Sequence, residues 1–176
     1  MKKLQIGCGN DIRNGYINLD GSKKVNPDIV WNLEKTPLPF KANQFDEILA
    51  NHVLEHVVNF IPLVHELHRI SKKNGKIIIR TPFYSAWGQF NDPTHVRFFS
   101  PWTFGYFNRG NYSHEVNSKG NMFNIIKVKI NFGIGSSSKL NWLINPLINF
   151  SQRVYCRFFA WIFSAAEIYY ELEVLK

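Results

Sequence analysis

Two glycines and an aspartate near the N-terminus are spaced as in a nucleotide-binding turn. Gly7 and Gly9 follow a short apolar run that ends at Ile6, and a backbone without a Cβ atom can turn sharply there and approach a ligand closely. Asp20 stands at the tip of the next apolar run, 17–19, where its carboxylate could accept both hydroxyl hydrogens of a ribose. A glycine turn alone is a weak signal, because such turns also serve purely structural purposes. The ordered pair of features predicts an adenosine-binding site.

Farther along the chain, three residues reproduce a zinc-binding motif. His52, Glu55 and His56 match the sequence His-x-x-Glu-His of inverted zincin metallopeptidases, in which two imidazoles bind zinc and the carboxylate serves as a base. The run follows a strand-like apolar stretch, Phe45–Ala50, in a nucleotide-fold pattern, and the chain is short for such a peptidase. We therefore interpret the match as coincidental and expect no metal site.

A third candidate is a polar pair inside an aromatic stretch, Asp92 and His95. Histidine has a pKa near neutrality and can take a proton from an acceptor hydroxyl, and a neighbouring carboxylate can orient its ring. We predict His95 as the base and Asp92 as its partner, with His52 and His56 as competing candidates. The alternative is that Asp92 and His95 only tie down their loop through hydrogen bonds.

Length and composition favour one globular domain spanning residues 1–176. Of the 176 residues, 45% are hydrophobic and 15% aromatic, which is enough apolar surface for one packed core. Disorder and coiled coil are therefore poor interpretations. The chain has 21 Lys and Arg against 13 Asp and Glu, a net charge of +8. This balance favours an anionic partner without choosing among nucleic acid, a membrane surface and a phosphorylated substrate.

The N-terminus shows no export signal, since only residues 4–6 separate its two lysines from Gly7 and no apolar region follows. No uninterrupted stretch reaches the roughly 18 apolar residues that a membrane-spanning helix requires. The two cysteines, Cys8 and Cys156, lack metal-ligand spacing and are too few for a disulfide scaffold. We expect a cytoplasmic protein with reduced thiols.

Short apolar runs that alternate with a helical period predict an α/β fold with a parallel sheet. Apolar residues recur at helical spacing within 52–72. Pro62 places the start of that helix nearby, with Asn59 as N-cap and the run 72–75 as its C-terminal signal. The predicted strands are Lys3–Ile6, Tyr16–Asp20, Asp28–Trp31, Phe45–Ala50, Lys76–Arg80, Phe123–Phe132 and Ile168–Leu175.

Two segments of the second half have unusual compositions. Residues 83–115 are rich in aromatics, Gly, Pro and Asn, and we predict a substrate-side insertion whose aromatic wall would exclude water and hold an apolar or sugar ring face. Residues 139–166 are apolar and helical in pattern, with Arg153 and Arg157 among them. Such a segment could lie on a membrane surface, cover the sheet or form a dimer contact.

Six short motifs, taken in order, resemble class I S-adenosylmethionine-dependent methyltransferases of the small type 11 kind. Each motif is loose by itself, but the ordered set over about residues 3–107 is fairly specific. The stretch 92–101 is also similar to one branch of that family. The six motifs are Gly7-Cys8-Gly9-Asn10, Asn18-Leu19-Asp20, Pro37-Leu38-Pro39-Phe40, Phe45-Asp46-Glu47-Ile48, His52-Val53-Leu54-Glu55-His56-Val57 and Lys73-Asn74-Gly75-Lys76.

The resemblance implies S-adenosylmethionine as the cofactor and gives roles to the residues that match. Gly7 and Gly9 would line the methionine end, and Asp20 would hold the ribose hydroxyls. Asn32 and Leu33 stand where the family often has Asp-Leu beside the adenine. Asparagine is a departure there, but an amide can still hydrogen-bond the adenine edge.

The resemblance also implies a Rossmann-like, mostly parallel seven-stranded sheet with an antiparallel last strand, which 168–175 fits. Asn51 and His52, at the end of the fourth strand, would flank the reactive sulfonium. Too few residues separate Gly9 from Tyr16 for a normal crossover helix. We expect this first crossover helix to be reduced to one turn. Otherwise the second strand is not the neighbour of the first, and the ribose-binding aspartate loses its role.

The sequence therefore predicts a methyltransferase acting on an oxygen or nitrogen of a small-molecule or glycan-type acceptor. One alternative is a non-catalytic domain of the same fold that serves as a partner subunit. Another is a nucleic-acid methyltransferase or binding protein, which is disfavoured because the basic residues are scattered and an Asn/Asp-Pro-Pro-aromatic motif is absent after the fourth strand. Segment 140–166 leaves a peripheral membrane contact and an oligomer contact open.

Overall fold

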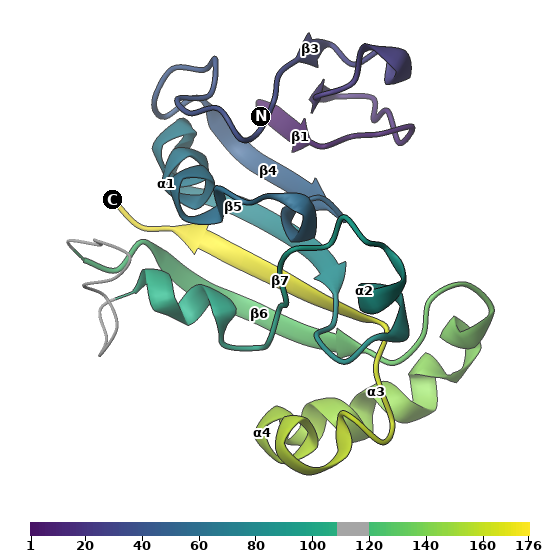
Figure 1. Ribbon diagram of the computed structural model, residues 1–176. Helices are drawn as coiled ribbons and strands as arrows, with labels where there is room; N and C mark the ends of the chain where they lie inside the picture. The colour runs from purple at the N-terminus through teal and green to yellow at the C-terminus, as the bar shows by residue number, and fades with distance from the viewer. Residues whose placement is uncertain (109–119) are drawn as a thin grey trace.

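The computed structural model describes residues 1–108 and 120–176, whose strands form one seven-stranded sheet (Figure 1). The strand order is β3-β2-β1-β4-β5-β7-β6. Strands β1 to β5 run parallel, and β7 lies antiparallel between β5 and β6. This confirms the predicted Rossmann-like sheet with its antiparallel last strand. The strands are β1 (Lys3–Ile6), β2 (Tyr16–Asp20), β3 (Ile29–Val30), β4 (Phe45–Asn51), β5 (Ser71–Pro82), β6 (Phe123–Asn131) and β7 (Glu167–Val174).

The connection between β1 and β2 is shorter than a normal crossover. The two strands are parallel neighbours, with Lys3 beside Tyr16 and Ile6 beside Leu19. Residues 7–15 between them form turns and contain no helix, so the expected single helical turn is wrong. The second strand is nevertheless the neighbour of the first. Its last residue therefore lies at the edge of the sheet where the glycine turn begins.

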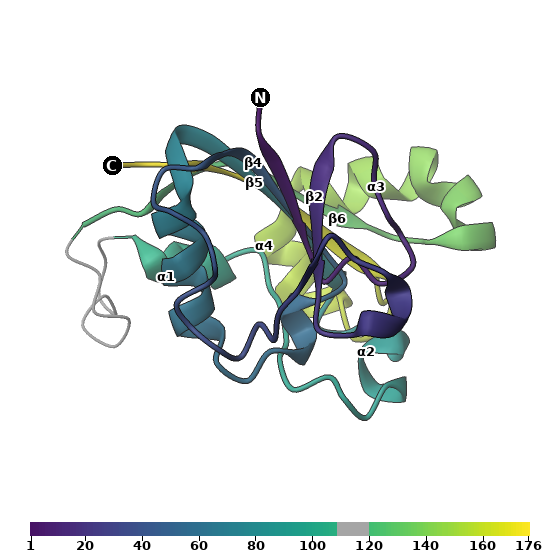
Figure 2. The same ribbon diagram turned by 90° about the horizontal axis from the view of Figure 1, so that it is seen from above.

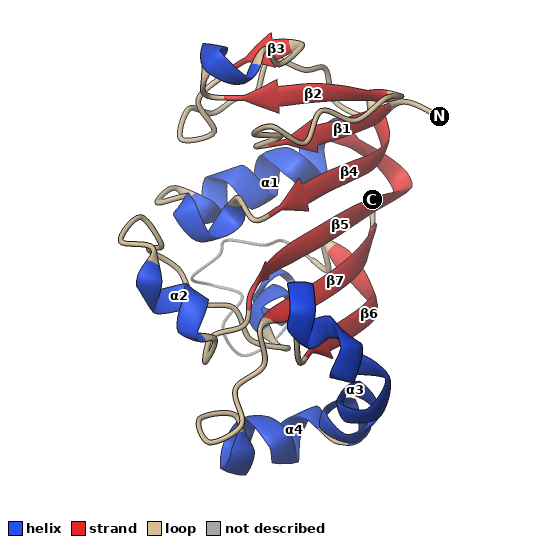
Figure 3. Cartoon of the chain, turned by 90° about the vertical axis from the view of Figure 1, so that its right-hand side faces the viewer, coloured by secondary structure: helices blue, strands red, loops and turns tan. Residues whose placement is uncertain are grey.

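The missing crossover helix leaves one face of the sheet without a helical layer. Helix α1 (Phe60–Ile70) packs on one face, whereas no helix of the described chain covers the other face of β1, β4 and β5 (Figure 3). Parallel sheets are usually buried on both faces. Here the open face carries polar pairs, such as Lys3 Nζ with Glu47 Oε1 at 3.2 Å. The Arg80 guanidinium also lies 5.5 Å from the Tyr169 ring centroid. These side chains make the open face compatible with water.

Helix α1 begins where the sequence predicts and ends earlier. Asn59 occupies the N-cap position, which confirms the predicted start. The helix stops because Ser71 is extended (φ −73°, ψ 149°) and its hydroxyl donates to the Leu67 carbonyl at 2.7 Å. The run 72–75, predicted as a helix C-terminal signal, belongs to β5 instead. The helical pattern before Asn59 is also interrupted, because a separate 3₁₀ turn spans Leu54–His56.

Part of the predicted substrate-side insertion, 83–115, packs into the protein core. It contains the short helix α2 (Trp87–Asn91). Phe99 and Phe104 are buried, and the Phe104 ring lies edge-on to Tyr170 of β7 with 4.9 Å between the centroids. These aromatics therefore hold the insertion against the sheet. Residues 109–115 of this prediction lie outside the described residues.

The predicted helical segment 139–166 is several short helices. Helix α3 (Asn141–Phe150) ends at Ser151, which adopts an extended conformation (φ −141°, ψ 90°). Helix α4 (Gln152–Val154) follows and continues as a π-helical turn, Tyr155–Phe159. Figure 2 shows α1 and α3 on opposite sides of the central strands. The segment thus lies beside the β6 edge of the sheet, away from α1.

Amide side chains on α3 cap the free edge of β6. The Asn145 Oδ1 atom accepts the N–H of Phe132 at 2.8 Å. The Asn149 amide accepts the N–H of Ile130 at 2.8 Å and donates to its carbonyl at 2.7 Å. A strand edge with satisfied backbone groups is protected against pairing with another chain. The helix consequently turns its polar side toward the sheet.

Candidate active site

The turn after β1 brings the carboxylate of Asp20 against the backbone of Gly9. Both Gly7 (φ 58°) and Gly9 (φ 51°) adopt the left-handed conformation, which glycine adopts without steric penalty. The Gly9 N–H donates to Asp20 Oδ2 at 2.9 Å, and the Ser22 N–H donates to Oδ1 at 2.8 Å. An ionised carboxylate offers about four acceptor positions. Asp20 is therefore oriented by the backbone and retains acceptor capacity for a ligand.

The two glycines differ in what surrounds them. A Cβ atom added to Gly7 would lie 2.2 Å from Cγ2 of Val53, so the segment after β4 packs directly against this residue. A Cβ atom added to Gly9 would meet nothing within 4 Å. Gly7 is thus required by packing, whereas the space beside Gly9 is open to a ligand.

Asn32 and Leu33, which are predicted to lie beside the adenine, follow β3, and the chain there runs close to Asp20. The Trp31 N–H donates to the Asp20 carbonyl at 2.9 Å, which places residues 32 and 33 just beyond it. The Asn32 Oδ1 atom accepts the Glu34 N–H at 2.9 Å, so the amide NH₂ is the group that would donate to an adenine. Leu33 is buried in the core.

Asn51 and His52, the two residues predicted beside the sulfonium, line different cavities. Asn51 lines a hollow of about 320 Å³ together with Arg13, Arg80 and Tyr169, on the face of the sheet that no helix covers. His52 lines a separate cavity at the carboxyl ends of β4 and β5. The structure thus separates the side chains of Asn51 and His52.

His52 lies between two buried carboxylates. Its backbone adopts the left-handed conformation (φ 50°), and its Nε2 lies 3.1 Å from Oε2 of Glu167 and its Nδ1 3.4 Å from Oε1 of Glu55. The hydrogen bond to Glu167 and the neighbouring Glu55 carboxylate raise the pKa of His52 to about 9. The imidazole is therefore protonated at neutral pH and donates hydrogen bonds instead of accepting a proton.

One cavity brings together the three residues predicted to be catalytic. His52, Asp92 and His95 line a cavity of about 500 Å³, whose other walls come from the start of α2, the 132–137 segment and the residues 164–166 just before β7. His95 Nδ1 lies 3.1 Å from the Gln89 carbonyl oxygen. Since a carbonyl only accepts, Nδ1 carries the hydrogen and the lone pair is on Nε2. The nearer Asp92 oxygen lies 3.8 Å from His95 Nε2.

Asp92 also organises its own loop. Its Oδ1 accepts the Thr94 N–H at 2.8 Å and the Thr94 hydroxyl at 2.6 Å. These hydrogen bonds hold the pKa of Asp92 below its ordinary value. The loop-tying interpretation of Asp92 therefore describes real contacts, and they leave Oδ2 directed at His95.

Glu167 was not among the site residues predicted from the sequence. It lies 115 positions from His52 in the chain and is buried. Burial opposes its ionisation, but hydrogen bonds from His52 and Asn131 hold the pKa of Glu167 below its ordinary value. The signal available in the sequence was an acid at the start of the last strand, directly after a long run without acids.

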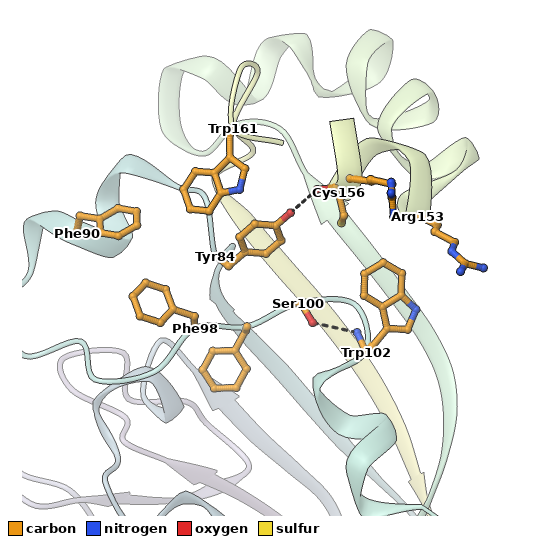
Figure 4. A pocket seen from close by; sticks show the side chains of 10 residues that line it. Tyr84, Phe90, Phe98, Ser100, Trp102, Arg153, Cys156 and Trp161 are labelled. Carbon is orange, nitrogen blue, oxygen red and sulfur yellow. Dashed lines mark hydrogen bonds between the residues drawn. The ribbon is translucent and has the colours of Figure 1, made fainter. Parts of the chain in front are cut away.

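A second cavity, of about 940 Å³, lies between the 84–102 segment and the C-terminal helices (Figure 4). Aromatic side chains form most of its wall, and Tyr84 fixes the two sides together by donating from its hydroxyl to the Cys156 carbonyl at 2.9 Å. Arg153 and Arg157 supply positive charge. The arrangement suits a ligand with an apolar or ring-shaped part and an anionic group.

Comparisons with known proteins agree with this geometry. Residues 4–79 match the family model described as a methyltransferase domain. A segment of 42 residues, 24% of this chain, is 50% identical to an uncharacterized protein of Methanocaldococcus jannaschii, and the match spans 18% of that protein.

Two solved structures share the fold at low sequence identity. The crystal structure of a SAM-dependent methyltransferase from Archaeoglobus fulgidus matches with a TM-score of 0.64 and 14% identity, covering 98% of this chain and 85% of that one. The [4+2]-cyclase SpnF matches with a TM-score of 0.60 and 13% identity, covering 99% and 75%. The open position beside Gly9 and the oriented carboxylate of Asp20 would fit S-adenosylmethionine, the cofactor that the description of the Archaeoglobus fulgidus structure names. Together, these matches show that the chain has the fold of S-adenosylmethionine-dependent methyltransferases and that its residues 4–79 resemble a methyltransferase domain.

Proposed function

We propose that the protein transfers a methyl group from S-adenosylmethionine to an oxygen or nitrogen of a small-molecule or glycan-type acceptor. The observation that carries this proposal is the cavity of about 500 Å³ lined by His52, Asp92 and His95. It lies at the carboxyl ends of β4 and β5, the edge at which open α/β sheets bind their ligands. The acceptor would enter this cavity.

In this proposal the cofactor supplies a methyl group on a sulfonium, and the chain holds it at the β1 and β2 ends. The Asp20 carboxylate accepts the ribose hydroxyls, and the space beside Gly9 takes the methionine part. The Asn32 amide donates to the adenine beside Leu33. Such residues act by position, because an in-line displacement is accelerated mainly by aligning its two reacting atoms.

His95 is the proposed base. Its Nδ1–H is fixed by the Gln89 carbonyl, so Nε2 can accept the proton that an acceptor hydroxyl loses. The Asp92 carboxylate would stabilise the resulting imidazolium across the 3.8 Å separation. His52, already protonated, would hold the acceptor as a hydrogen-bond donor.

The larger aromatic cavity supports an acceptor with a ring or lipid part, and the charge of Arg153 and Arg157 supports an anionic group such as a phosphate. A second candidate function comes from the fold shared with SpnF, whose name describes a cyclase and not a methyltransferase. A non-catalytic partner subunit remains the third candidate, because the short first crossover alters the cofactor edge.

The experiment combines binding and transfer. Purified protein is titrated calorimetrically with S-adenosylmethionine, and methyl-labelled cofactor is then incubated with glycan, lipid-linked and small-molecule fractions. We expect binding by both the wild type and a His95→Gln variant, and label transfer only by the wild type. Binding without transfer to any fraction would favour the cyclase-like candidate, and no binding would favour the partner subunit.

We also infer that residues 140–163 contact an anionic membrane surface. Within the described residues, no helix is both long and apolar enough to cross a bilayer. The polar side of α3 faces β6, so its apolar side faces outward, and Phe150 is 93% exposed. Exposed apolar residues occur on both sides of the break at Ser151, namely Leu143, Leu147, Phe150, Val154, Phe158 and Ile162. We call this set the outward apolar face.

The basic residues near the outward apolar face support an anionic membrane as its occupant. Residues 139–163 carry Lys139, Arg153 and Arg157 and no acidic residue. A second copy docked through the same face would bring these positive charges together, whereas anionic lipid headgroups would neutralise them. Apolar side chains flanked by Lys and Arg are typical of segments that lie in the membrane interface.

A further inference from the structure

The Glu55 side chain is buried without a compensating hydrogen bond. Its exposed fraction is 0%, and neither carboxylate oxygen has a hydrogen-bond partner within the described residues. The Nδ1 atom of His52 lies 3.4 Å from Oε1 of Glu55. The same imidazole bonds to Glu167 through its other nitrogen. Glu167 is also compensated at its Oε1 by Arg80 Nη1 at 3.6 Å and by the Asn131 amide at 2.9 Å. A buried carboxylate needs a positive partner or several donors, and within the described residues Glu55, unlike Glu167, has no hydrogen-bond donor.

Two further imidazoles reach the same point. One candidate ligand atom from each of Glu55, His56 and His95 lies within 4.8 Å of the other two. The His56 and His95 rings are arranged edge to face, with 4.7 Å between their centroids. Two imidazoles and one carboxylate form a donor set that binds divalent transition metals.

The hydrogen bonds of both rings leave a nitrogen lone pair available to a metal. The Thr94 hydroxyl donates its hydrogen to Asp92 at 2.6 Å, so toward His56 Nδ1, at 2.8 Å, it must accept. His56 therefore carries its hydrogen on Nδ1 and its lone pair on Nε2. The bond from His95 Nδ1 to the Gln89 carbonyl gives that ring the same tautomer. Metal-binding histidines characteristically donate their other N–H to such an oxygen.

We propose that Glu55, His56 and His95 bind a divalent transition metal, with Zn²⁺ as the ion that the donors favour. A three-residue set leaves an open coordination position for water or a small ligand, and His95 places the site on the wall of the cavity of about 500 Å³. This assignment replaces the sequence expectation that no metal site exists. It also differs from the motif, because His95 takes the place that His-x-x-Glu-His would give to His52.

The site has one consequence for the proposed function, on which this step rests. A metal bound to His95 Nε2 occupies the lone pair that the proposed base would use. The ion and the base are therefore alternative states of the same imidazole. Metal binding itself requires neither cofactor nor acceptor and can be measured without them.

The test measures Zn²⁺ binding by calorimetry after the full chain has been treated with a chelator and dialysed. We expect one equivalent to bind to the wild type. Glu55→Gln and His56→Gln should each weaken binding by at least about tenfold, a loss known even for changes behind the ligands. The matched control is His65→Gln, a histidine of α1 that packs against Phe107, which should bind like the wild type. Equal binding by all four proteins would overturn the proposal.

NMR spectroscopy of the wild-type protein tests the same site without substitutions that could lower its stability. Long-range proton–nitrogen NMR spectra report which ring nitrogen carries hydrogen and which nitrogen binds metal. We expect His56 and His95 to show Nδ1–H tautomers without metal, and Nε2 signals that shift on addition of Zn²⁺. Shifts confined to other histidines would contradict the assignment. Failure to bind S-adenosylmethionine, by contrast, would affect only the proposed function.

Discussion

The Gly9 amide donates to the carboxylate of Asp20, with 2.9 Å between the nitrogen and Oδ2. This bond joins the glycine turn after β1 to the end of β2. It links the two ends of a connection that contains no helix. It also aims the carboxylate along the edge of the sheet where the ribose of the cofactor would lie. The two sequence features that predicted an adenosine site are therefore parts of one hydrogen-bonded unit.

Replacing this carboxylate should weaken cofactor binding. In an Asp20→Asn variant, the amide NH₂ would face a backbone N–H donor, and one charged hydrogen-bond acceptor for the ribose would be lost. We expect the affinity for S-adenosylmethionine and its demethylated product to fall at least about tenfold, because hydrogen bonds to charged groups contribute about 1.5–3 kcal/mol. Calorimetric titration measures the change. Asp11→Asn is the matched control, since the exposed Asp11 pairs only with Arg13 of the same loop; equal losses in both variants would contradict the ribose role.

The two glycines of the turn should respond differently to alanine. Gly7→Ala combines a left-handed residue with a Cβ atom 2.2 Å from Val53 Cγ2. Together these effects should lower the free energy of unfolding by about 2–5 kcal/mol. Gly9→Ala meets open space and should lower it by only about 1–2 kcal/mol, but it should weaken cofactor binding. Chemical denaturation and calorimetry measure the two effects separately.

A double variant identifies the cause of the Gly7 effect. Val53→Ala removes the nearest contact of the new Cβ atom, Cγ2 at 2.2 Å, but keeps Val53 Cβ at 2.6 Å, so the loss from Gly7→Ala should be smaller in that background without disappearing. The strain of the left-handed backbone stays in both. If the two losses are simply additive, the methyl groups of Val53 are not the reason for glycine at this position.

Local pattern was enough to predict the strands that carry the glycine turn and Asp20. Strands β1, β2 and β4 are short apolar runs bounded by turn residues, and Asp20 follows directly from where β2 ends. The first crossover was harder, because nine residues can form either a tight turn or one helical turn. What decides between them is the bond between Gly9 and Asp20, which spans 11 positions.

Contacts between distant segments could not be predicted from the sequence. The partner of His52, Glu167, is 115 positions away and becomes its neighbour only because β7 inserts between β5 and β6. Helix α1 ends at Ile70 because the Ser71 side chain bonds to the Leu67 carbonyl. The lysines that follow had suggested a longer helix. The pair of Asp92 and His95 was predicted from its residue types, but its position beside Glu55 and His56 could be seen only in the fold.

The ion pair between His52 and Glu167 should make stability depend on pH. The folded pKa of His52 is about 9, above the value of about 6.5 expected in the unfolded chain. Between these values the folded state binds more protons, so the free energy of unfolding should fall as the pH rises. The stabilisation is complete below about pH 6.5 and is lost as the pH passes through about 9. Denaturant titrations of chelator-treated protein across this range measure the slope.

The source of the raised pKa can be tested at its partner. Glu167→Gln removes the largest contribution, so the pKa of His52 measured by NMR should fall toward its ordinary value. A His52→Gln variant should flatten the pH dependence of unfolding. Glu171→Gln is a suitable control, because Glu171 lies on the same strand and pairs with Lys76 instead. An unchanged His52 titration in Glu167→Gln would show that another group protonates it.

The outward apolar face should carry the protein onto anionic vesicles. Burying two large apolar side chains contributes about 3–6 kcal/mol, so Leu147→Ser with Phe150→Ser should reduce partitioning into phosphatidylglycerol vesicles by far more than about tenfold. The control pair, Ile12→Ser with Val58→Ser, removes exposed apolar side chains elsewhere on the surface. Sedimentation with vesicles measures the bound fraction, and equal effects of the two pairs would contradict a specific membrane face.

The effect of removing positive charge distinguishes binding to a membrane from binding to a second copy of the chain. Arg153→Gln with Arg157→Gln should weaken binding to anionic vesicles by roughly 2 kcal/mol, since each basic residue near such a surface contributes about 1 kcal/mol. The same pair should leave binding to neutral vesicles almost unchanged, and raised salt should act like the substitutions. A dimer formed through this face would behave oppositely, because removing like charges from a self-contact strengthens it. Light scattering that shows a dimer strengthened by the arginine substitutions and lost in Leu147→Ser with Phe150→Ser would therefore replace the membrane by a second copy.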